Sequence, residues 1–456
     1  MRELGHWEEI PSTAQRCGRR ISRRRNGMWA TMCDVSVAGF MSSAKCVVAK
    51  VADMHYGNGA TTPCSDIKSS EMPYCSDLNT TAFVRRMIQK EAPDLIVYTE
   101  ENNPVETVDY IGDNIDWGAS DAKTSMDAAF APAIESNIPW AAILGNHDVD
   151  SNLPRPHLME YISQMKNSLA KVLDPQAAGV HGWGNYYLSV FGSSATPTEN
   201  TSLLNLYFLD SGDNSKLPEI RGYDWIRRSQ QTWFSSLSQQ LRMASPAPAL
   251  AFFHIPIPEY DTILYRDQVT GRQLEDVYSA PINSGFFSTL LESGDVQATF
   301  VGHDHLNDYC GKLMGVNLCY GGGTGYHAYG RVGVPRRARV IFANLNEPQG
   351  RSLNISTWKR LDDSDMTKID EQLLYSKATD VRSPVRTFAY RKGCSWPWSP
   401  FKYPQGKCFF WSSVIYTGVV TLLSIFAFFS GFLFHRYRHK SSLAYKPLNS
   451  ENKDKE

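Results

Sequence analysis

The sequence predicts a layered α/β domain followed by a single transmembrane helix, and three observations support this prediction. Short apolar runs alternate with longer amphipathic stretches, as strands and helices do in α/β proteins. Polar residues recur directly after the apolar runs, and one long apolar segment near the C-terminus carries no charged residue. The chain has 456 residues, of which 42% are hydrophobic and 20% charged. It is therefore long and apolar enough to fold into two or three domains.

The expected strands and helices can be read from the chain in order. Between residues 80 and 90, the apolar side chains Ala82, Phe83, Met87 and Ile88 recur at helical spacing. Strands are expected where four to seven mostly apolar residues follow one another between turn residues. The expected strands are Cys46–Val51, Asp94–Thr99, Trp140–Leu144, Leu203–Leu209, Ala249–His254 and Ala298–Val301, and the expected helices are Thr80–Lys90 and Asp121–Ser136.

The chain is expected to consist of one large folded domain with a basic segment before it and a membrane anchor after it. The expected parts are a leader or poor signal peptide at 1–44, the domain at 45–380, a Trp- and Pro-rich stalk at 381–408, a transmembrane helix at 409–434 and a cytosolic tail at 435–456. Lysine and arginine number 46 against 47 acidic residues, which gives a net charge of −1. A nucleic-acid-binding protein should carry a basic excess, so we expect no nucleic-acid partner.

The apolar segment Phe409–Phe434 is longer than the roughly 20 residues that a transmembrane helix needs. The basic residues directly after it place the tail in the cytosol by the positive-inside rule. The domain is then lumenal or extracellular, in the secretory pathway or at the plasma membrane or vacuole. A buried helix of a soluble protein and a tail anchor with a cytosolic domain are the alternatives. At the N-terminus, Asp34 interrupts the apolar stretch that a signal peptide requires, so the segment is at most a poor signal peptide. A basic leader, or a start that is not the real one, is the alternative.

Two further features agree with a lumenal domain. Three N-glycosylation sequons begin at Asn79, Asn200 and Asn354. Among nine cysteines, two pairs are close in turn-rich sequence and are candidates for local disulfides in an oxidising compartment. These pairs are Cys64 with Cys75 and Cys310 with Cys319; buried free thiols are the alternative for each.

The candidate chemistry lies in polar residues that directly follow the apolar runs. Ligands of α/β sheets bind outside the carboxyl ends of the strands, so these clusters should converge on one crevice. Asp, His and Asn side chains without a nearby thiolate suit two divalent or trivalent ions of hard to borderline character. The residues are Asp53 and His55 after CVVAKVA, Asp113 after VDYI, Asn146, His147 and Asp148 after WAAIL, His254 after ALAFF, and His303 and His305 after ATFV.

The ordered set D-x-H, GD, GNHD, FFH and GHDH resembles the calcineurin-like metallophosphoesterase superfamily. The stretches ADMHYG, LYFLDSGD, GYDWI, FFHIPIPE, VGHDHLNDYCG and LCYGGGTGYHAYG resemble its plant purple-acid-phosphatase-related branch, several members of which carry the label "probable inactive". The resemblance covers about residues 45 to 365. It implies a two-layer β-sandwich flanked by helices, with a dinuclear metal site at one edge.

The resemblance also implies roles for the candidate residues. Asp53, His55 and His305, which we call the first set, would hold one metal ion. Asn146, His254 and His303, the second set, would hold the other. Asp113 would bridge the two ions, His147 would face the substrate phosphate, and Asp148 would orient His147. Two such ions share a hydroxide that attacks phosphorus in line. Purple acid phosphatases carry a tyrosine that binds iron where this chain has Asp116, so the two ions are expected to be Fe, Mn or Zn.

The segment Glu100–Ile111 separates the apolar run ending at Thr99 from Asp113, whereas in the relatives such a run leads straight into the aspartate. Either Asp94–Thr99 or the later ETVDYI could form the strand before Asp113. Displacing Asp94–Thr99 would expose three large apolar side chains at ~1.5–3 kcal/mol each. We therefore expect Asp94–Thr99 to remain in the sheet.

The first functional hypothesis is a membrane-anchored hydrolase that cleaves phosphate monoesters. Phosphodiesters or pyrophosphate are the alternative substrates, and a tethered inactive pseudo-phosphatase is the non-enzymatic alternative. Tyr326 and His327, after three glycines at 321–323, could line the substrate crevice, and a glycine-rich turn that closes the sheet is an equal interpretation.

Overall fold

The computed structural model describes residues 45–99, 121–191, 201–265, 269–345 and 353–377. All of them belong to one of the two units into which the chain divides, Met1–Thr379. The predicted leader, stalk, transmembrane helix and tail lie outside the described residues, as do Asp113 and Asn200. Among the residues that are described, no helix has both the length and the apolar character needed to cross a membrane.

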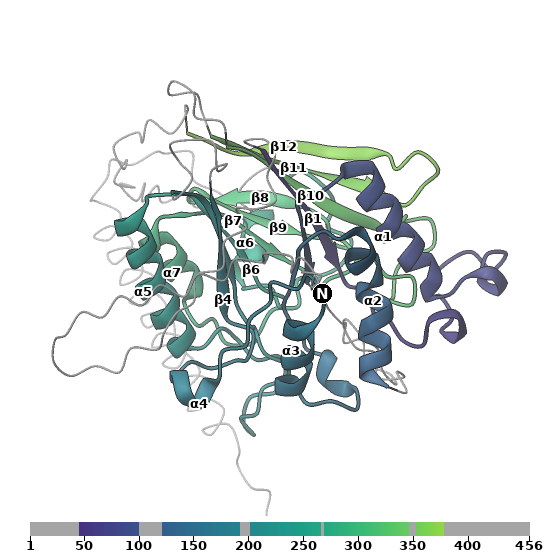
Figure 1. The fold of residues 1–456 in the computed structure, drawn as a ribbon, viewed down its shortest axis with the longest axis horizontal. Coiled ribbons are helices and arrows are strands. Elements are labelled where there is room, and N and C mark those ends of the chain that lie inside the picture. The colour runs from purple at the N-terminus through teal and green to yellow at the C-terminus, as the bar shows by residue number, and fades with distance from the viewer. Residues whose placement is uncertain (1–44, 100–120, 192–200, 266–268, 346–352, 378–456) are drawn as a thin grey trace, which may run out of the picture. The chain divides into compact units, whose positions relative to one another are not determined.

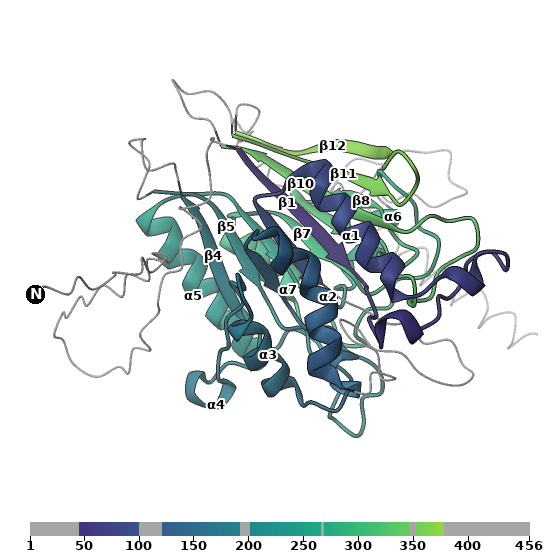
Figure 2. The ribbon, with the colours of Figure 1, turned by 45° about the vertical axis from the view of Figure 1, so that its right-hand side comes forward.

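Two six-stranded mixed sheets form the centre of the unit (Figures 1 and 2). In the first sheet, β1, β2 and β3 are parallel, and β10, β11 and β12 extend it in antiparallel fashion beyond β1. In the second sheet, β5, β6, β7 and β9 are parallel, with β4 and β8 antiparallel at the two edges. The first sheet has the order β12 (Lys368–Ser376), β11 (Asn354–Leu361), β10 (Arg337–Asn344), β1 (Lys45–Ala52), β2 (Leu95–Thr99) and β3 (Trp140–Ala142), and the second has the order β4 (Tyr186–Phe191), β5 (Ser202–Phe208), β6 (Ala249–Phe252), β7 (Val296–Val301), β9 (Val316–Tyr320) and β8 (Cys310–Leu313).

Helices cover the outer faces of this sandwich, and each side has its own core. The larger core joins apolar side chains of both sheets to those of α1 and α2, and the second core joins the other face of the second sheet to α5, α6 and α7. Figure 1 shows α1 and α2 on one side of the sheets and α5 and α7 on the other. The helices are α1 (Asp77–Glu91), α2 (Ala122–Ser136), α3 (Arg155–Gln164), α4 (Pro175–Ala178), α5 (Arg228–Ala244), α6 (Glu259–Leu264) and α7 (Phe286–Ser293). The predicted helix-flanked, two-layer arrangement is therefore present.

The apolar run Asp94–Thr99, which precedes the segment Glu100–Ile111, stays in the sheet as predicted. Strand β2 lies between β1 and β3, and Leu95, Ile96 and Val97 are fully buried. The burial of these side chains stabilises the strand whatever follows it along the chain. The segment Glu100–Ile111 and the bridging role of Asp113 lie outside the described residues and remain predictions.

Both predicted disulfides are present. Cys64 is bonded to Cys75 across a turn-rich loop, and Cys310 is bonded to Cys319 directly opposite it in the β8–β9 hairpin. Two sequons can be placed: Asn79 lies in the first turn of α1, where its Oδ1 accepts a hydrogen bond from the Ser76 N–H, and Asn354 begins β11. Glycosylation of either remains a prediction.

Candidate metal centre

The candidate ligands lie directly after parallel strands of both sheets. Asp53 and His55 follow β1, Asn146 follows β3, His254 follows β6, and His303 and His305 follow β7. Because parallel strands present their carboxyl ends at the same edge, the two sheets bring these residues to one place. All six side chains are buried, with at most 1% of their surface exposed.

The backbone is strained where several of these side chains leave their strands. Asp53, His55 and His303 have left-handed φ angles of 59°, 47° and 81°. Such conformations cost about 1–3 kcal/mol each in a non-glycine residue and persist where the surroundings enforce them. Gly302 is required for the same close approach, because a Cβ there would lie 2.5 Å from Asp53 Oδ1. The surrounding structure therefore holds these three residues in strained backbone conformations, and these conformations set the directions of their side chains.

Hydrogen bonds connect two members of the first set to each other and the third member to the second set. His305 Nδ1 lies 3.0 Å from the carbonyl oxygen of Tyr329, which can only accept, so Nδ1 carries the proton and Nε2 the lone pair. His55 Nε2 lies 2.9 Å from His305 Nε2 and donates to it. The lone pair of His55 is then at Nδ1. Asp53 Oδ1 accepts from the backbone N–H of His303 at 3.2 Å, which links the first set to the second.

The second set is joined in a similar way. His254 Nε2 lies 3.0 Å from Asn146 Oδ1 and 3.3 Å from His303 Nδ1. A proton on His254 Nε2 serves both acceptors and leaves the lone pair of His254 at Nδ1. The ring of Tyr223 meets His303 edge-on, with 4.4 Å between centroids. Hydrogen bonds thus join His55 to His305 and His254 to both Asn146 and His303. The division of the six residues between two metal ions remains a prediction.

Burial and neighbouring charges favour the neutral form of three of the imidazoles. Burial, reinforced by the neighbouring histidines, lowers the pKa of His55, His254 and His303 well below the ordinary value. Neutral imidazole is the form that binds metal ions. Burial raises the pKa of Asp53 to about 7 against the opposing charge of Lys50. A cation beside Asp53 would favour its carboxylate form.

Three buried polar atoms of the two sets support a cation site. Asp53 Oδ2, His55 Nδ1 and His254 Nδ1 have no hydrogen-bond partner within the described part of the chain. An unsatisfied buried group costs about 1–3 kcal/mol, which a bound cation would remove. Within those same ranges, no group of three or more His, Cys, Asp or Glu side chains is already arranged to hold a metal ion. Binding an ion in the first set would replace the hydrogen bond between His55 and His305.

His147 and Asp148 occupy the turn beside the second set. His147 is half-buried and lies close enough to His55, His254 and His303 for its charge to lower the pKa of each. Asp148 is buried, and its Oδ2 accepts from the Gly145 N–H at 2.9 Å, which closes the Gly-Asn-His-Asp turn. The orientation of His147 by Asp148 remains a prediction.

Comparison with known proteins agrees with this geometry. The family model "Calcineurin-like phosphoesterase" matches residues 48–307, more than half of the chain and all of the described ligand positions. The chain belongs to this family. Members of the family bind a dinuclear metal centre, and the resemblance to the purple-acid-phosphatase-related branch is confirmed by the relatives.

Three relatives show how far the similarity extends. The chain is 45% identical to "Probable inactive purple acid phosphatase 29" of Arabidopsis thaliana, over 81% of this chain and 91% of the relative. It is 46% identical to "Probable inactive purple acid phosphatase 14" of the same plant, over 75% of this chain and 87% of the relative. It is 34% identical to "Phosphatase DCR2" of Saccharomyces cerevisiae, over 71% of this chain and 55% of the relative.

One largely buried ion pair beside the second set was not foreseen from the sequence. Arg155, the first residue of α3, donates to both carboxylate oxygens of Asp210 and to the carbonyl oxygens of Gly145 and Leu144, at 2.6 and 3.0 Å. Asp210 comes soon after β5, so the same strand-end rule could have found it. Arg155 follows a proline in a loop and shows no periodic signal.

A second buried charge cluster supports the loop that carries His305. Asp308 lies between Arg337 Nε and Lys359 Nζ, each at 2.6 Å, and all three side chains are at most 2% exposed. Arg337 also donates to the carbonyl oxygen of His305 at 3.0 Å. Arg337 and Lys359 lie on strands that were not predicted, so their role could not be foreseen.

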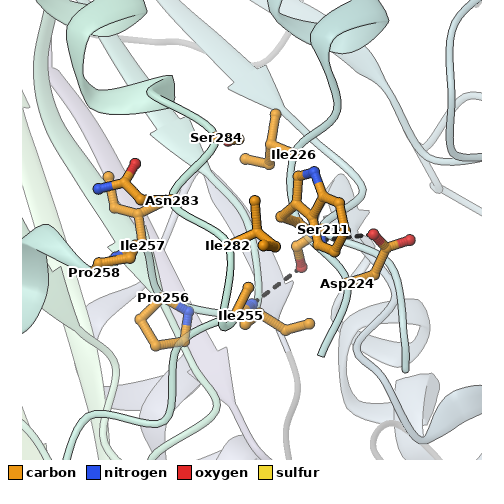
Figure 3. Close-up of a pocket in the computed structure, with 12 residues that line it drawn as sticks. Ser211, Asp224, Ile226, Ile255, Pro256, Ile257, Pro258, Ile282, Asn283 and Ser284 are labelled. Carbon is orange, nitrogen blue, oxygen red and sulfur yellow. Dashed lines mark hydrogen bonds between the residues drawn. The ribbon is translucent and has the colours of Figure 1, made fainter. Parts of the chain in front are cut away.

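A mostly apolar pocket lies beside His254, and its volume is about 300 Å³ including the part open to solvent. Figure 3 shows the residues that line it. Ile255, the residue after His254, is one wall, and its N–H donates to Ser211 Oγ at 3.0 Å. Trp225 and Ile282 contribute further apolar surface. Because no candidate ligand lines this pocket, we do not assign the substrate to it.

Proposed function

We propose that this protein is a metal-dependent phosphoesterase that hydrolyses phosphate monoesters. The observation that supports this most directly is the pairing of two buried ligand sets, each with two histidines, at the carboxyl ends of strands from both sheets. Family membership supports hydrolysis of a phosphate ester, and the monoester preference rests on the resemblance to acid phosphatases.

The first set and the second set would each hold one ion of Mn, Zn or Fe, with Asp113 as the proposed bridge. Two such ions supply Lewis-acid activation of the phosphate and of the attacking water. The protein's own part is to hold the ligands in place by the strained backbone at Asp53, His55 and His303, and to favour the neutral form of three of the imidazoles by burial. It also excludes bulk water, because all six described ligands are covered.

His147 is the described side chain best placed to act on the substrate itself. It is half-buried, adjacent to Asn146 of the second set and within electrostatic range of both sets. We assign it the donation of a hydrogen bond to the phosphate, or of a proton to the leaving oxygen. Such a group contributes about 10²–10⁴-fold to turnover.

We further propose that the domain is lumenal or extracellular and anchored by the segment Phe409–Phe434. The basic residues after that segment and the two disulfides support this topology. Glycosidase treatment of the protein from membranes should then increase its gel mobility through Asn79, Asn200 or Asn354. An unchanged band, with the domain cleaved by protease added from the cytosolic side, would favour the tail-anchored alternative.

The function is tested with the purified full-length chain in detergent. Its metal content would be measured, and hydrolysis would be assayed against para-nitrophenyl phosphate, a bis-ester and pyrophosphate. We expect close to two ions per chain and the highest activity on the monoester. The alternative of an inactive pseudo-phosphatase is supported by the relatives whose names include the word "inactive". Fewer than two ions together with no hydrolysis of any substrate would support the pseudo-phosphatase.

A further inference from the structure

The loop after β9 is bonded directly to the backbone of the first set. The Thr324 N–H donates to the Ala52 carbonyl and the Gly325 N–H to the Asp53 carbonyl, each at 2.9 Å. Gly325 is pressed so closely against this backbone that a Cβ there would collide with the Met54 carbonyl. Residue 325 therefore touches the segment that presents Asp53 and His55.

Four residues later, the same loop contacts the third member of the first set. The Tyr329 ring stacks on His305 with 3.8 Å between centroids, and the Tyr329 carbonyl oxygen accepts from His305 Nδ1. His327 lies midway between Gly325 and Tyr329 and is half-buried. The chain thus places His327 beside the first set, with contacts to that set on either side of it.

The ring of His327 is anchored from outside the loop. His327 Nδ1 donates to the carbonyl oxygen of Pro63 at 2.6 Å, and because that oxygen can only accept, Nδ1 carries the proton. The neutral ring then has its lone pair at Nε2. Pro63 precedes Cys64, so the disulfide to Cys75 fixes the segment that holds the ring.

A buried arginine fixes the backbone around the anchor. Arg336 donates to the carbonyl oxygens of Ala328, Tyr329 and Ser65 at 2.7–2.9 Å. The Ser65 N–H in turn donates to the Tyr326 carbonyl at 2.8 Å. The backbone on both sides of His327 is therefore bonded to the residues that follow Pro63, which supports the position of the imidazole bonded to Pro63.

His327 acts electrostatically on its surroundings. Burial lowers the pKa of His55, and charge on neighbouring histidines, His327 among them, lowers it further. Burial raises the pKa of Asp77 to about 7, and the charge of His327 opposes that increase. The first effect agrees with a position near His55, and the second with a position near Asp77, whose Oδ2 accepts from the N–H of Gly57 at 2.9 Å.

We propose that His327 is a catalytic residue that contacts the substrate: its Nε2, in the protonated ring, donates a hydrogen bond to a phosphate oxygen at the first set, as His147 does at the second. This rests on the proposed function. A pre-positioned cationic donor beside developing phosphate charge loses little freedom when substrate binds, which favours tight binding in the transition state.

Two substitutions of His327 test separately the hydrogen bond of Nδ1 to Pro63 and the proposed hydrogen bond of Nε2 to phosphate. His327→Asn keeps an N–H donor near the position of Nδ1 and so retains the bond to Pro63, but it has no group at the position of Nε2. His327→Gln places an N–H near Nε2 and loses the anchor. His157→Asn is the matched control, because His157 is exposed on α3 and lies outside the described ligand sets.

Each variant would be prepared as the full-length chain loaded with Mn²⁺. We would measure metal content, binding of inorganic phosphate by calorimetry, and kcat/KM on para-nitrophenyl phosphate. For His327→Asn we expect two ions per chain, with phosphate binding and kcat/KM each reduced about 10- to 100-fold, the range for losing one hydrogen bond to a charged group. His327→Gln should recover part of this loss, and His157→Asn should match the wild type.

Wild-type phosphate affinity and kcat/KM in His327→Asn would overturn the inference and leave the proposed function intact. Loss of metal from His327→Asn would also overturn it, because His327 would then support the ligands rather than contact the substrate. If the metal-loaded wild type neither bound phosphate nor hydrolysed esters, the proposed function itself would fail.

Discussion

The two candidate ligand sets use the same kinds of side chain but are supported by different parts of the fold. The first set depends on side chains carried by strands: Arg337 on β10 and Lys359 on β11 hold Asp308, and Arg337 also holds the His305 carbonyl. The second set depends on a helix and a loop, because Arg155 at the start of α3 holds both Asp210 and the Gly145 carbonyl.

The features that bring the ligands together therefore differ from the features that hold them in place. Strand ends bring all six described ligands together, whereas buried ion pairs hold the turns after the strands. Removing one partner of a buried pair leaves an uncompensated charge and is costly. Damage to the strand-borne cluster should therefore destabilise the whole domain, whereas damage at Arg155 should also disturb the second set locally.

The largest effect is expected from removing a ligand of the second set. Asn146→Ala or His303→Ala should reduce the metal content to about one ion per chain and abolish hydrolysis, because both ions take part in the reaction. His55→Ala should do the same through the first set. The metal content of each variant, measured after dialysis, would test the expected loss of one ion. Two retained ions in Asn146→Ala would show that the second set does not hold an ion.

His147→Ala should act on turnover and leave the metals in place. We expect two ions per chain and a decrease in kcat of about 10²–10⁴-fold, which is typical for the loss of one acid–base group. Steady-state kinetics with parallel metal analysis would measure both. If His147→Ala lost metal as severely as Asn146→Ala, the division between ligands and substrate contact would be wrong.

The sequence predicted the parts of the site that follow the periodic strands. Strands β1, β2, β3, β6 and β7 were recognisable because short apolar runs end in turn residues, and the six described ligands come soon after the ends of β1, β3, β6 and β7. The C-terminal strands β10, β11 and β12 were missed because polar and charged residues interrupt their apolar pattern. Arg339 and Lys359 read as solvent-facing residues, yet both are fully buried.

Long-range support could not be predicted for a physical reason. The hydrogen bond between His55 and His305 spans 250 positions, and that between Arg155 and Asp210 spans 55. Local patterns carry no information about which distant charge meets which carboxylate. His327 is an intermediate case, because its position after three glycines suggested the crevice but not its anchor at Pro63.

Arg155→Ala tests the helix-borne support. The substitution leaves Asp210 buried and without its arginine, which should reduce the free energy of unfolding by about 3 kcal/mol. It should also weaken metal binding at the second set, because the turn that carries Asn146 loses two hydrogen bonds. Denaturant unfolding and metal titration measure the two effects. Arg85→Ala, which removes a pair whose side chains are about half exposed, is the control and should cost less than 1 kcal/mol.

The smallest effect concerns pH and the strand-borne support. The Arg337 and Lys359 charges overcome burial and lower the pKa of Asp308 to about 2. Because the pKa is lower in the folded than in the unfolded state, the contribution of Asp308 is fully present above about pH 4 and is lost as the pH falls toward 2. At about 1.4 kcal/mol per pH unit, this contribution amounts to about 2 kcal/mol.

The difference in unfolding free energy between wild type and Asp308→Asn should therefore shrink between pH 5 and pH 2, whereas the exposed control Glu219→Gln should show no such change. A difference that stayed constant over this range would mean that Asp308 contributes through its shape and hydrogen bonds rather than through its charge, and the strand-borne support would then differ from the Arg155 pair in kind as well as in place.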